Sequence, residues 1–151
     1  MKFEKFLKGC GTHGQIVKRE NGDKWLICGG VGMRVPAGVV NLLGAGEVSE
    51  KTHEIVEAIV TADTDERIQL TEATLPADGK ASDIIRVFGD GYNRVRVRNA
   101  DFGLLERADV FLAYLEIVQE DDDLNELIDR FLLVLDPTKE VIGFIAGVPE
   151  N

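Results

Sequence analysis

The sequence predicts an α+β fold in which antiparallel β-hairpins predominate and two or three helices pack against them. Two observations support this class. Strand-like segments occur in pairs around turn-forming residues, which is typical of antiparallel hairpins. Strand-like and helix-like segments also do not alternate regularly, as they would in a doubly wound parallel sheet. Because the sequence has no internal repeat and no long linker, we expect a single domain over residues 1–151.

The first third of the sequence predicts a short amphipathic helix, a tight hairpin and a third strand. Apolar residues recur at helical spacing near the N-terminus until glycine interrupts the pattern. Asn21-Gly22 joins two apolar segments, and this dipeptide favours the positive φ angles of a two-residue turn. Pro36 limits the third strand because proline has no amide proton for a ladder. The helix should present Phe3, Phe6, Leu7 and Cys10 on one face, and the strands should lie within 15–20, 24–28 and 31–35.

The middle of the sequence predicts a helix and a second hairpin. Ser49 is a suitable N-cap residue, and the apolar residues after it recur at helical spacing. Residues 67–71 alternate like a half-buried strand, and residues 75–80 are rich in turn formers. Residues 84–88 and 94–98 flank a loop with two glycines, which favours a hairpin. The helix should bury Ile55, Val56, Ile59 and Ala62, and a loop over 38–46 should precede it.

The C-terminal third has two interpretations. Residues 110–118 are mostly apolar and predict a strand that is covered on both faces. Asp123 and Glu126 have the spacing of a capping box, and the apolar residues around them have the spacing of a helix. The alternative is a strand over 131–135 that turns and returns, and the two elements can also follow each other. The helix would bury Leu124, Leu127, Ile128, Phe131 and Leu132, whereas the alternative strand would turn at 136–139 and return over 141–145.

Composition and charge restrict the partners and the compartment. The net charge is −10, from 27 acidic and 17 basic residues, which opposes non-specific binding to nucleic acid or anionic lipid. The longest apolar stretch is much shorter than the ~20 residues that cross a bilayer. Charges interrupt the apolar residues at the N-terminus, so no signal-peptide core forms there. We therefore expect a cytoplasmic protein with two reduced cysteines.

An arginine row is the most unexpected feature of this acidic sequence. Arg94, Arg96 and Arg98 alternate with Val95 and Val97, so a strand would place the three guanidinium groups on one face. Arginine binds phosphate and carboxylate groups through two parallel hydrogen bonds, which suggests a nucleotide-like anion or an acidic partner. The other interpretation is a solvated strand face that pairs with acidic side chains of the sheet. The expected anion site consists of Arg86, Tyr92, Arg94, Arg96 and Arg98.

The two cysteines and two histidines suggest a metal site. Cys10 and His13 are separated by two residues, which allows both side chains to reach one tetrahedral zinc ion. Cys28 and His53 would complete four ligands. The same Cys10–His13 pair also raises thiol catalysis, because an imidazole can stabilise a nearby thiolate. The alternative is that the cysteines are ordinary core thiols and the histidines lie on the surface.

These patterns favour a binding role over catalysis, because no pair of carboxylates and no complete nucleophile–base set is present. We expect a non-catalytic interaction module, oligomeric or bound to another protein, whose arginine-bearing hairpin contacts an anionic ligand or an acidic partner. One alternative is a structural subunit of a larger assembly such as a phage or viral particle. The other is a zinc-dependent or thiol-dependent enzyme that uses Cys10, His13, Cys28 and His53.

Overall fold

The computed structural model describes residues 1–39, 46–63, 67–70, 73–74, 84–90, 93–107, 109 and 111–149. The helices are α1 (Phe3–Cys10), α2 (Glu50–Thr61) and α3 (Asn99–Phe102). The strands of the first half are β1 (Gln15–Lys18), β2 (Lys24–Cys28), β3 (Val31–Arg34), β4 (Gly46–Glu47), β5 (Ile68–Leu70) and β6 (Ala73–Thr74). The remaining strands are β7 (Ile85–Asp90), β8 (Asn93–Arg98), β9 (Phe111–Glu120), β10 (Glu126–Leu135) and β11 (Val141–Ala146).

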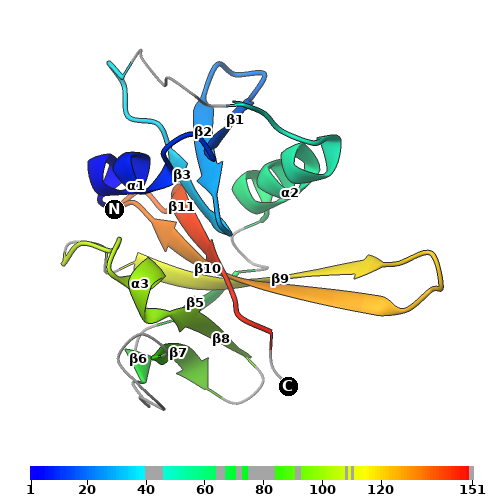
Figure 1. Ribbon diagram of the computed structural model, residues 1–151. Coiled ribbons are helices and arrows are strands. Elements are labelled where there is room, and N and C mark those ends of the chain that lie inside the picture. The colour runs from blue at the N-terminus through cyan, green and yellow to red at the C-terminus, as the bar shows by residue number, and fades with distance from the viewer. Residues whose placement is uncertain are drawn as a thin grey trace.

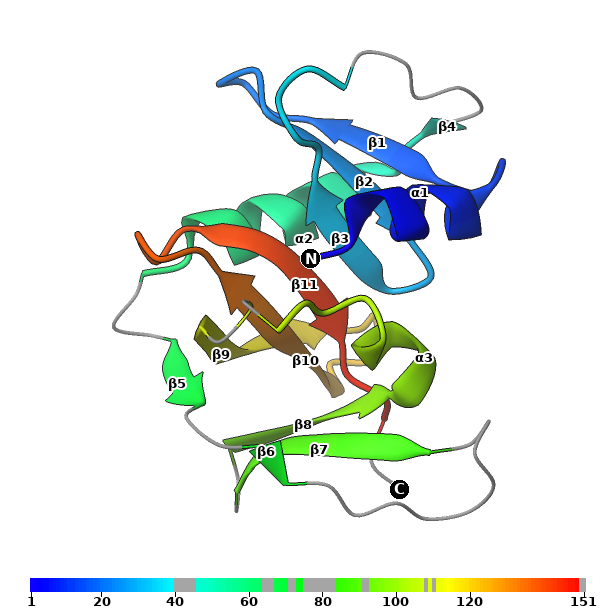
Figure 2. The ribbon, with the colours of Figure 1, turned by 90° about the vertical axis from the view of Figure 1, so that its left-hand side faces the viewer.

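The strands form a large and a small sheet (Figures 1 and 2). The large sheet has the order β4-β1-β2-β3-β11-β10-β9-β5, and the small sheet has the order β6-β7-β8. Neighbouring strands are antiparallel, except that β4 pairs parallel with β1. In Figure 2 the small sheet lies at the bottom, below β9, β10 and β11. The fold is therefore α+β with mostly antiparallel pairing, as predicted, and strands predominate over helices.

The central part of the large sheet is buried on both faces, and each face has its own helix. Because successive side chains of a strand point to opposite faces, Leu132 and Leu133 belong to different clusters of buried residues. The first cluster joins α1 and the small sheet to the large sheet through Phe3, Phe6, Leu26, Phe88, Val95, Val97, Leu132 and Ile145. The second cluster packs α2 on the opposite face through Trp25, Val56, Ile59, Phe131, Leu133 and Phe144.

The elements predicted for the N-terminal half are present, but two details differ. Only Val56 and Ile59 of the expected α2 stripe are buried, and the turn is not the predicted two-residue type because Asn21 lacks a positive φ. The first helix buries Phe3, Phe6 and Cys10, and β1, β2 and β3 follow in the expected positions. The β1–β2 hairpin turns at Gly22, whose φ of 93° is a conformation that glycine adopts easily. The side chain of Ser49 caps α2 by accepting a hydrogen bond from the amide of Thr52 at 3.2 Å.

The helix predicted around residues 124–132 is wrong, because β10 occupies Glu126–Leu135. In β10, residues 126–129 are exposed and residues 131–135 are buried. An amphipathic helix would instead alternate buried and exposed residues with a period of about 3.6. The apparent helical spacing combined exposed apolar residues of the hairpin tip with a continuous apolar run from Phe131, which is buried on both faces of the sheet. The alternative is confirmed: Asp136 accepts amide hydrogen bonds from Thr138 and Glu140 at 2.9 and 3.0 Å, and the chain returns as β11.

The other elements expected from the sequence have mixed outcomes. The strand expected over 110–118 is present as β9, but it is not covered on both faces throughout, since Val118 is exposed. Both hairpin strands β7 and β8 are present, and β5 lies within the expected segment 67–71. The short helix α3 had no signal in the sequence. Most of the loop expected over 38–46 and the whole turn-rich segment 75–80 lie outside the described residues.

Replacing Gly32 with alanine should lower the free energy of unfolding by about 1–3 kcal/mol, the usual cost of overpacking a core. A Cβ atom at Gly32 would overlap Cε1 of Phe144, whose ring packs in the second buried cluster. Urea unfolding monitored by circular dichroism measures this change. The matched control is Gly9→Ala in α1, where a Cβ would meet nothing within 4 Å. This control should be neutral or stabilising by up to about 1 kcal/mol; equal destabilisation by both variants would contradict the packing argument.

Candidate functional site

The arginine row occupies one face of β8. Val95 and Val97 point into the first buried cluster, which places Arg94, Arg96 and Arg98 on the opposite face. Arg94 and Arg98 are exposed and Arg96 is half-buried. Arg98 also lies near α3: burial raises the pKa of Asp101, and the charge of Arg98 opposes that increase. The row is therefore a cationic stripe with its backbone anchored by two buried valines.

Arg86 is not part of this row. It pairs with Val97 across the hairpin, and directly paired residues of antiparallel strands share a face, so Arg86 lies on the side of the core. Its Nε donates a hydrogen bond to Oδ1 of Asn99 at 2.7 Å, and its guanidinium carbon lies 4.2 Å from the centre of the Phe102 ring. Arg86 thus attaches α3 to the small sheet. Tyr92, the other residue expected at the site, lies outside the described residues.

The expected zinc ligands are not assembled. Cys10 and Cys28 are free thiols, and burial together with the neighbouring thiol of Cys28 raises the pKa of Cys10 to about 12. Cys10 packs in the cluster beneath α1, whereas His53 belongs to α2, which covers the opposite face of the sheet. His13 is exposed. Among the described residues, no group of three or more His, Cys, Asp or Glu side chains is placed to hold a metal ion.

The distal half of the β9–β10 hairpin, residues 116–130, projects from the rest of the large sheet as an arm (Figure 1). Apolar side chains are exposed on it. Val118 and Ile128 face each other across the two strands and are 52% and 49% exposed. Leu127 is also exposed on the arm, and Leu124 at its tip is 77% exposed. These side chains form a group of exposed apolar residues on the arm.

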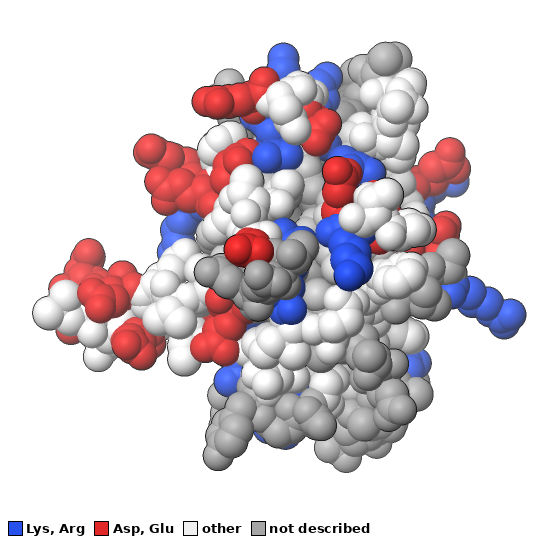
Figure 3. Space-filling view, turned by 180° about the vertical axis from the view of Figure 1, so that it is seen from behind, with Lys and Arg blue, Asp and Glu red and all other residues white. Residues whose placement is uncertain are grey.

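The arm is also strongly acidic. Its seven acidic residues and one arginine sum to −6, out of −10 for the chain. Figure 3 shows this acidic end of the arm at the left. Glu120 and Glu126 are paired directly opposite each other, and like charges in this arrangement repel. The acidic residues of the arm are Glu116, Glu120, Asp121, Asp122, Asp123, Glu126 and Asp129.

The tip of the arm is a compact turn. Asp121 accepts hydrogen bonds from the amides of Asp123 and Asn125 at 3.0 and 2.8 Å. The hydrogen bonds from Asn125 and Asp123 lower the pKa of Asp121. Leu124 has a φ of 61°, which is unfavourable for a leucine. A polar Asp-Asp-Asp-Leu-Asn segment between two alternating apolar segments is the signal that would have indicated a hairpin instead of a capped helix.

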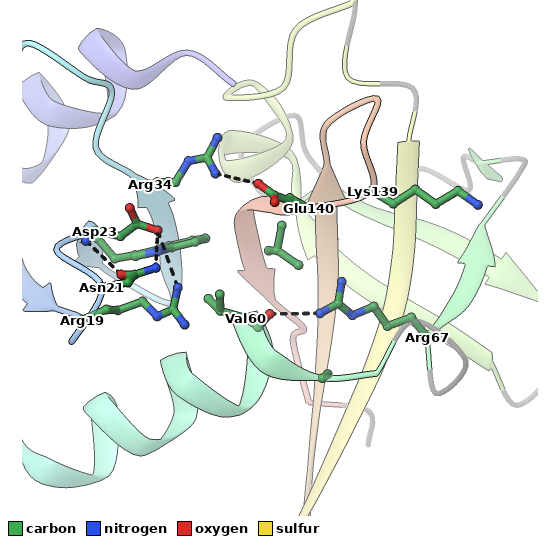
Figure 4. A pocket seen from close by; sticks show the side chains of 11 residues that line it. Arg19, Asn21, Asp23, Arg34, Val60, Arg67, Lys139 and Glu140 are labelled. Atoms are coloured by element: carbon green, nitrogen blue, oxygen red, sulfur yellow. Dashed lines mark hydrogen bonds and ion pairs between the residues drawn. The ribbon is translucent and has the colours of Figure 1, made fainter.

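A cavity of about 340 Å³ lies between the end of α2 and several strand ends (Figure 4). Arg19, Arg34 and Arg67 approach it from three parts of the chain that are distant in sequence. Arg19 is paired with Glu57 at 2.9 Å, and Arg34 with Glu140 at 3.5 Å. The sequence carried no sign of this site because its basic residues are single and separated by other elements. The lining consists of Arg19, Asn21, Asp23, Trp25, Arg34, Val60, Ala62, Arg67, Lys139, Glu140 and Val141.

No protein-family model, no curated protein and no solved structure matches this chain. Within the described residues, none of the helices has the length and apolar character needed to span a membrane.

Proposed function

We propose that the chain is a non-catalytic interaction module that assembles with copies of itself, the arm of one copy docking on the arginine row of the next. The observation that carries this proposal is the arm, which combines exposed aliphatic side chains with a charge of −6. Such a surface needs a partner that buries the aliphatic groups and neutralises the acids.

The arginine row has the complementary charge. Arg94, Arg96 and Arg98 lie on one face of β8 in a chain whose net charge is −10. Successive arginines on such a face are roughly 6.5–7 Å apart, and the directly paired Glu120 and Glu126 are about 4.5–5.5 Å apart at Cβ, so their flexible side chains can each reach one of two neighbouring guanidinium groups. Val118 and Ile128 are directly paired two residues nearer the base of the arm, on the same face as Glu120 and Glu126. They would be buried beside the ion pairs.

The contact joins two different surfaces, and this determines the kind of assembly that it can form. The arm and the arginine row are different surfaces, so the contact is head-to-tail and generates a ring or a filament. This geometry suits a structural subunit of a larger assembly, including a phage or viral particle. The contact requires no metal ion and no catalytic group.

Charge exchange between the two surfaces tests the proposal. Sedimentation velocity of the wild-type chain over a range of concentrations should show self-association. Glu120→Arg combined with Glu126→Arg should weaken it by at least about tenfold, because each close charge pair contributes on the order of 1 kcal/mol or more. Adding Arg96→Glu and Arg98→Glu to that variant should restore association, since the ion pairs form again with reversed signs.

Two further variants separate a specific contact from a general charge effect. Glu20→Arg combined with Glu54→Arg changes the net charge equally at exposed sites outside the arm and should weaken association much less. Leu124→Asn introduces a residue that tolerates positive φ and removes the apolar side chain at the tip, so it should weaken association while the fold is preserved. A wild-type chain that remains monomeric at all concentrations, or unchanged association of the arm variant, would refute the proposal.

A further inference from the structure

We propose that the cavity beside Trp25 binds a small acid through a carboxylate or phosphate group. This site is separate from the arm and from the arginine row, so the inference does not depend on the proposed assembly. The volume of about 340 Å³ is at the small end of the range for ligand pockets, which suits a compact molecule.

The charge of the lining favours an anion. The residues that line the cavity include four basic and two acidic side chains and sum to +2 in a chain of −10, and Glu57 lies beside them as the ion-pair partner of Arg19. In Figure 4, Arg34 lies near Glu140, Arg67 lies beyond Val60, and Lys139 extends away from the other labelled side chains. The three arginines are thus the groups that lie around the cavity itself, and a guanidinium group binds a carboxylate or phosphate by paired hydrogen bonds.

Trp25 supplies the second observation. Its side chain is fully buried and lines the cavity, yet its Nε1–H has no hydrogen-bond partner among the described residues. Buried N–H groups almost always have an acceptor, because leaving one without an acceptor is energetically costly. An oxygen atom of a bound acid would satisfy this donor only after a small shift of the lining, because Nε1 has less than 1 Å² of accessible surface.

Arg67 has the same deficiency. Its Nη2 donates to the backbone carbonyls of Ile59 and Val60 at 3.2 and 3.3 Å, while its buried Nε has no partner within the described part of the chain. Burial lowers the pKa of Arg67, and the charge of Asp63 opposes that change. The guanidinium is therefore poorly solvated and held by the last carbonyls of α2, so an anion in the cavity would stabilise its charge.

The ion pairs that already line the cavity leave room for a ligand. Arg34 pairs with Glu140 at 3.5 Å, and the side chain of Glu140 is 70% exposed. An exposed pair of this kind contributes little, so Glu140 can turn toward solvent when another carboxylate approaches Arg34. Arg19, in contrast, forms ion pairs with Glu57 and Asp23. It would line the site without releasing these partners to bind the ligand.

The single tryptophan makes the test direct. The indole N–H of Trp25 gives one cross-peak in a ¹H–¹⁵N spectrum of the full chain, because the sequence has no other tryptophan. Inorganic phosphate and citrate are titrated separately at constant ionic strength, with sodium chloride as the balancing salt. We expect at least one of them to produce a saturable shift with a half-point below about 10 mM, and the stronger one to identify phosphate or carboxylate as the preferred group.

Matched variants decide whether the shift reports this cavity. Arg67→Gln and Arg34→Gln should each weaken binding by at least about threefold, since each removes a charged donor. Arg34 is partly exposed, so Arg34→Gln remains informative if Arg67→Gln weakens the end of α2. Arg94→Gln removes a guanidinium from the arginine row and should leave the titration unchanged. The proposal is overturned if neither anion gives a saturable shift, or if all three variants respond like the wild type.

Discussion

Replacing Phe144 with alanine is expected to lower the free energy of unfolding by about 3–5 kcal/mol, the usual cost of removing a buried aromatic ring. Phe144 is 3% exposed, and its ring packs between the rings of Trp25 and Phe131. Its ring centre is 5.9 Å from that of Trp25, in a stacked arrangement, and 5.8 Å from that of Phe131, in an edge-to-face arrangement. The substitution therefore leaves a cavity and removes two favourable aromatic contacts. Denaturant unfolding, followed by the fluorescence of Trp25 and by circular dichroism, measures the loss.

The control for this prediction is Phe111→Ala, the same substitution at the start of β9. Phe111 is 37% exposed, so its removal should cost less than about 1.5 kcal/mol. If Phe144→Ala is too unstable to purify, Phe144→Leu retains most of the volume and should lie between the two. Similar losses at both phenylalanine positions would show that the three rings do not form the centre of the second buried cluster.

Cys10 is expected to resist alkylation in the folded protein. Burial and the neighbouring Cys28 thiol raise its pKa from 9.0 to about 12, so at pH 8 it carries roughly a thousandfold less thiolate than an exposed cysteine does. Because the thiolate is the nucleophile, the rate of reaction with iodoacetamide should fall by a similar factor. Peptide mapping after timed labelling at pH 8 gives the rate for each cysteine separately.

Cys28 provides the internal comparison, since it is partly exposed at the end of β2. We expect Cys28 to be labelled first, and both cysteines to react at similar rates in 6 M guanidinium chloride, where burial is lost. Equal rates for Cys10 in the folded and unfolded chain would contradict the burial of its thiol beneath α1. Such a result would also favour the hypothesis that Cys10 and His13 form a reactive thiol–imidazole pair.

The local elements of the fold were predictable because their signals lie within a few residues. Asn21-Gly22 dictates a tight turn, and Ser49 caps α2 through an amide only three residues away. Val95 and Val97 alternate with the arginines of β8, so the two faces of that strand were evident before the structure was known. Each of these predictions needs only backbone geometry and the contrast between apolar and polar side chains.

The side of the sheet on which Arg86 lies was not predictable. It depends on the register of the β7–β8 hairpin, and a shift of one residue would move Arg86 to the opposite face. The observed register pairs Gly89 with Arg94, and Gly89 has a φ of 86°, a conformation that alters the path of the strand near the loop. A correct alternation within each strand therefore did not establish which arginines share a surface.

The sequence by itself determined the class of fold, the first helix, both N-terminal hairpin strands and the alternating faces of β8. Only the tertiary structure decided that residues 126–135 form a strand, because residues 131–135 are buried on both faces of the sheet and the ladder with β9 continues from them through residues 126–130, which are mostly exposed. It also placed β11 between β3 and β10, and it brought Arg19, Arg34 and Arg67 around one cavity. Contacts between distant segments depend on how whole elements pack, and no short stretch of sequence encodes that arrangement.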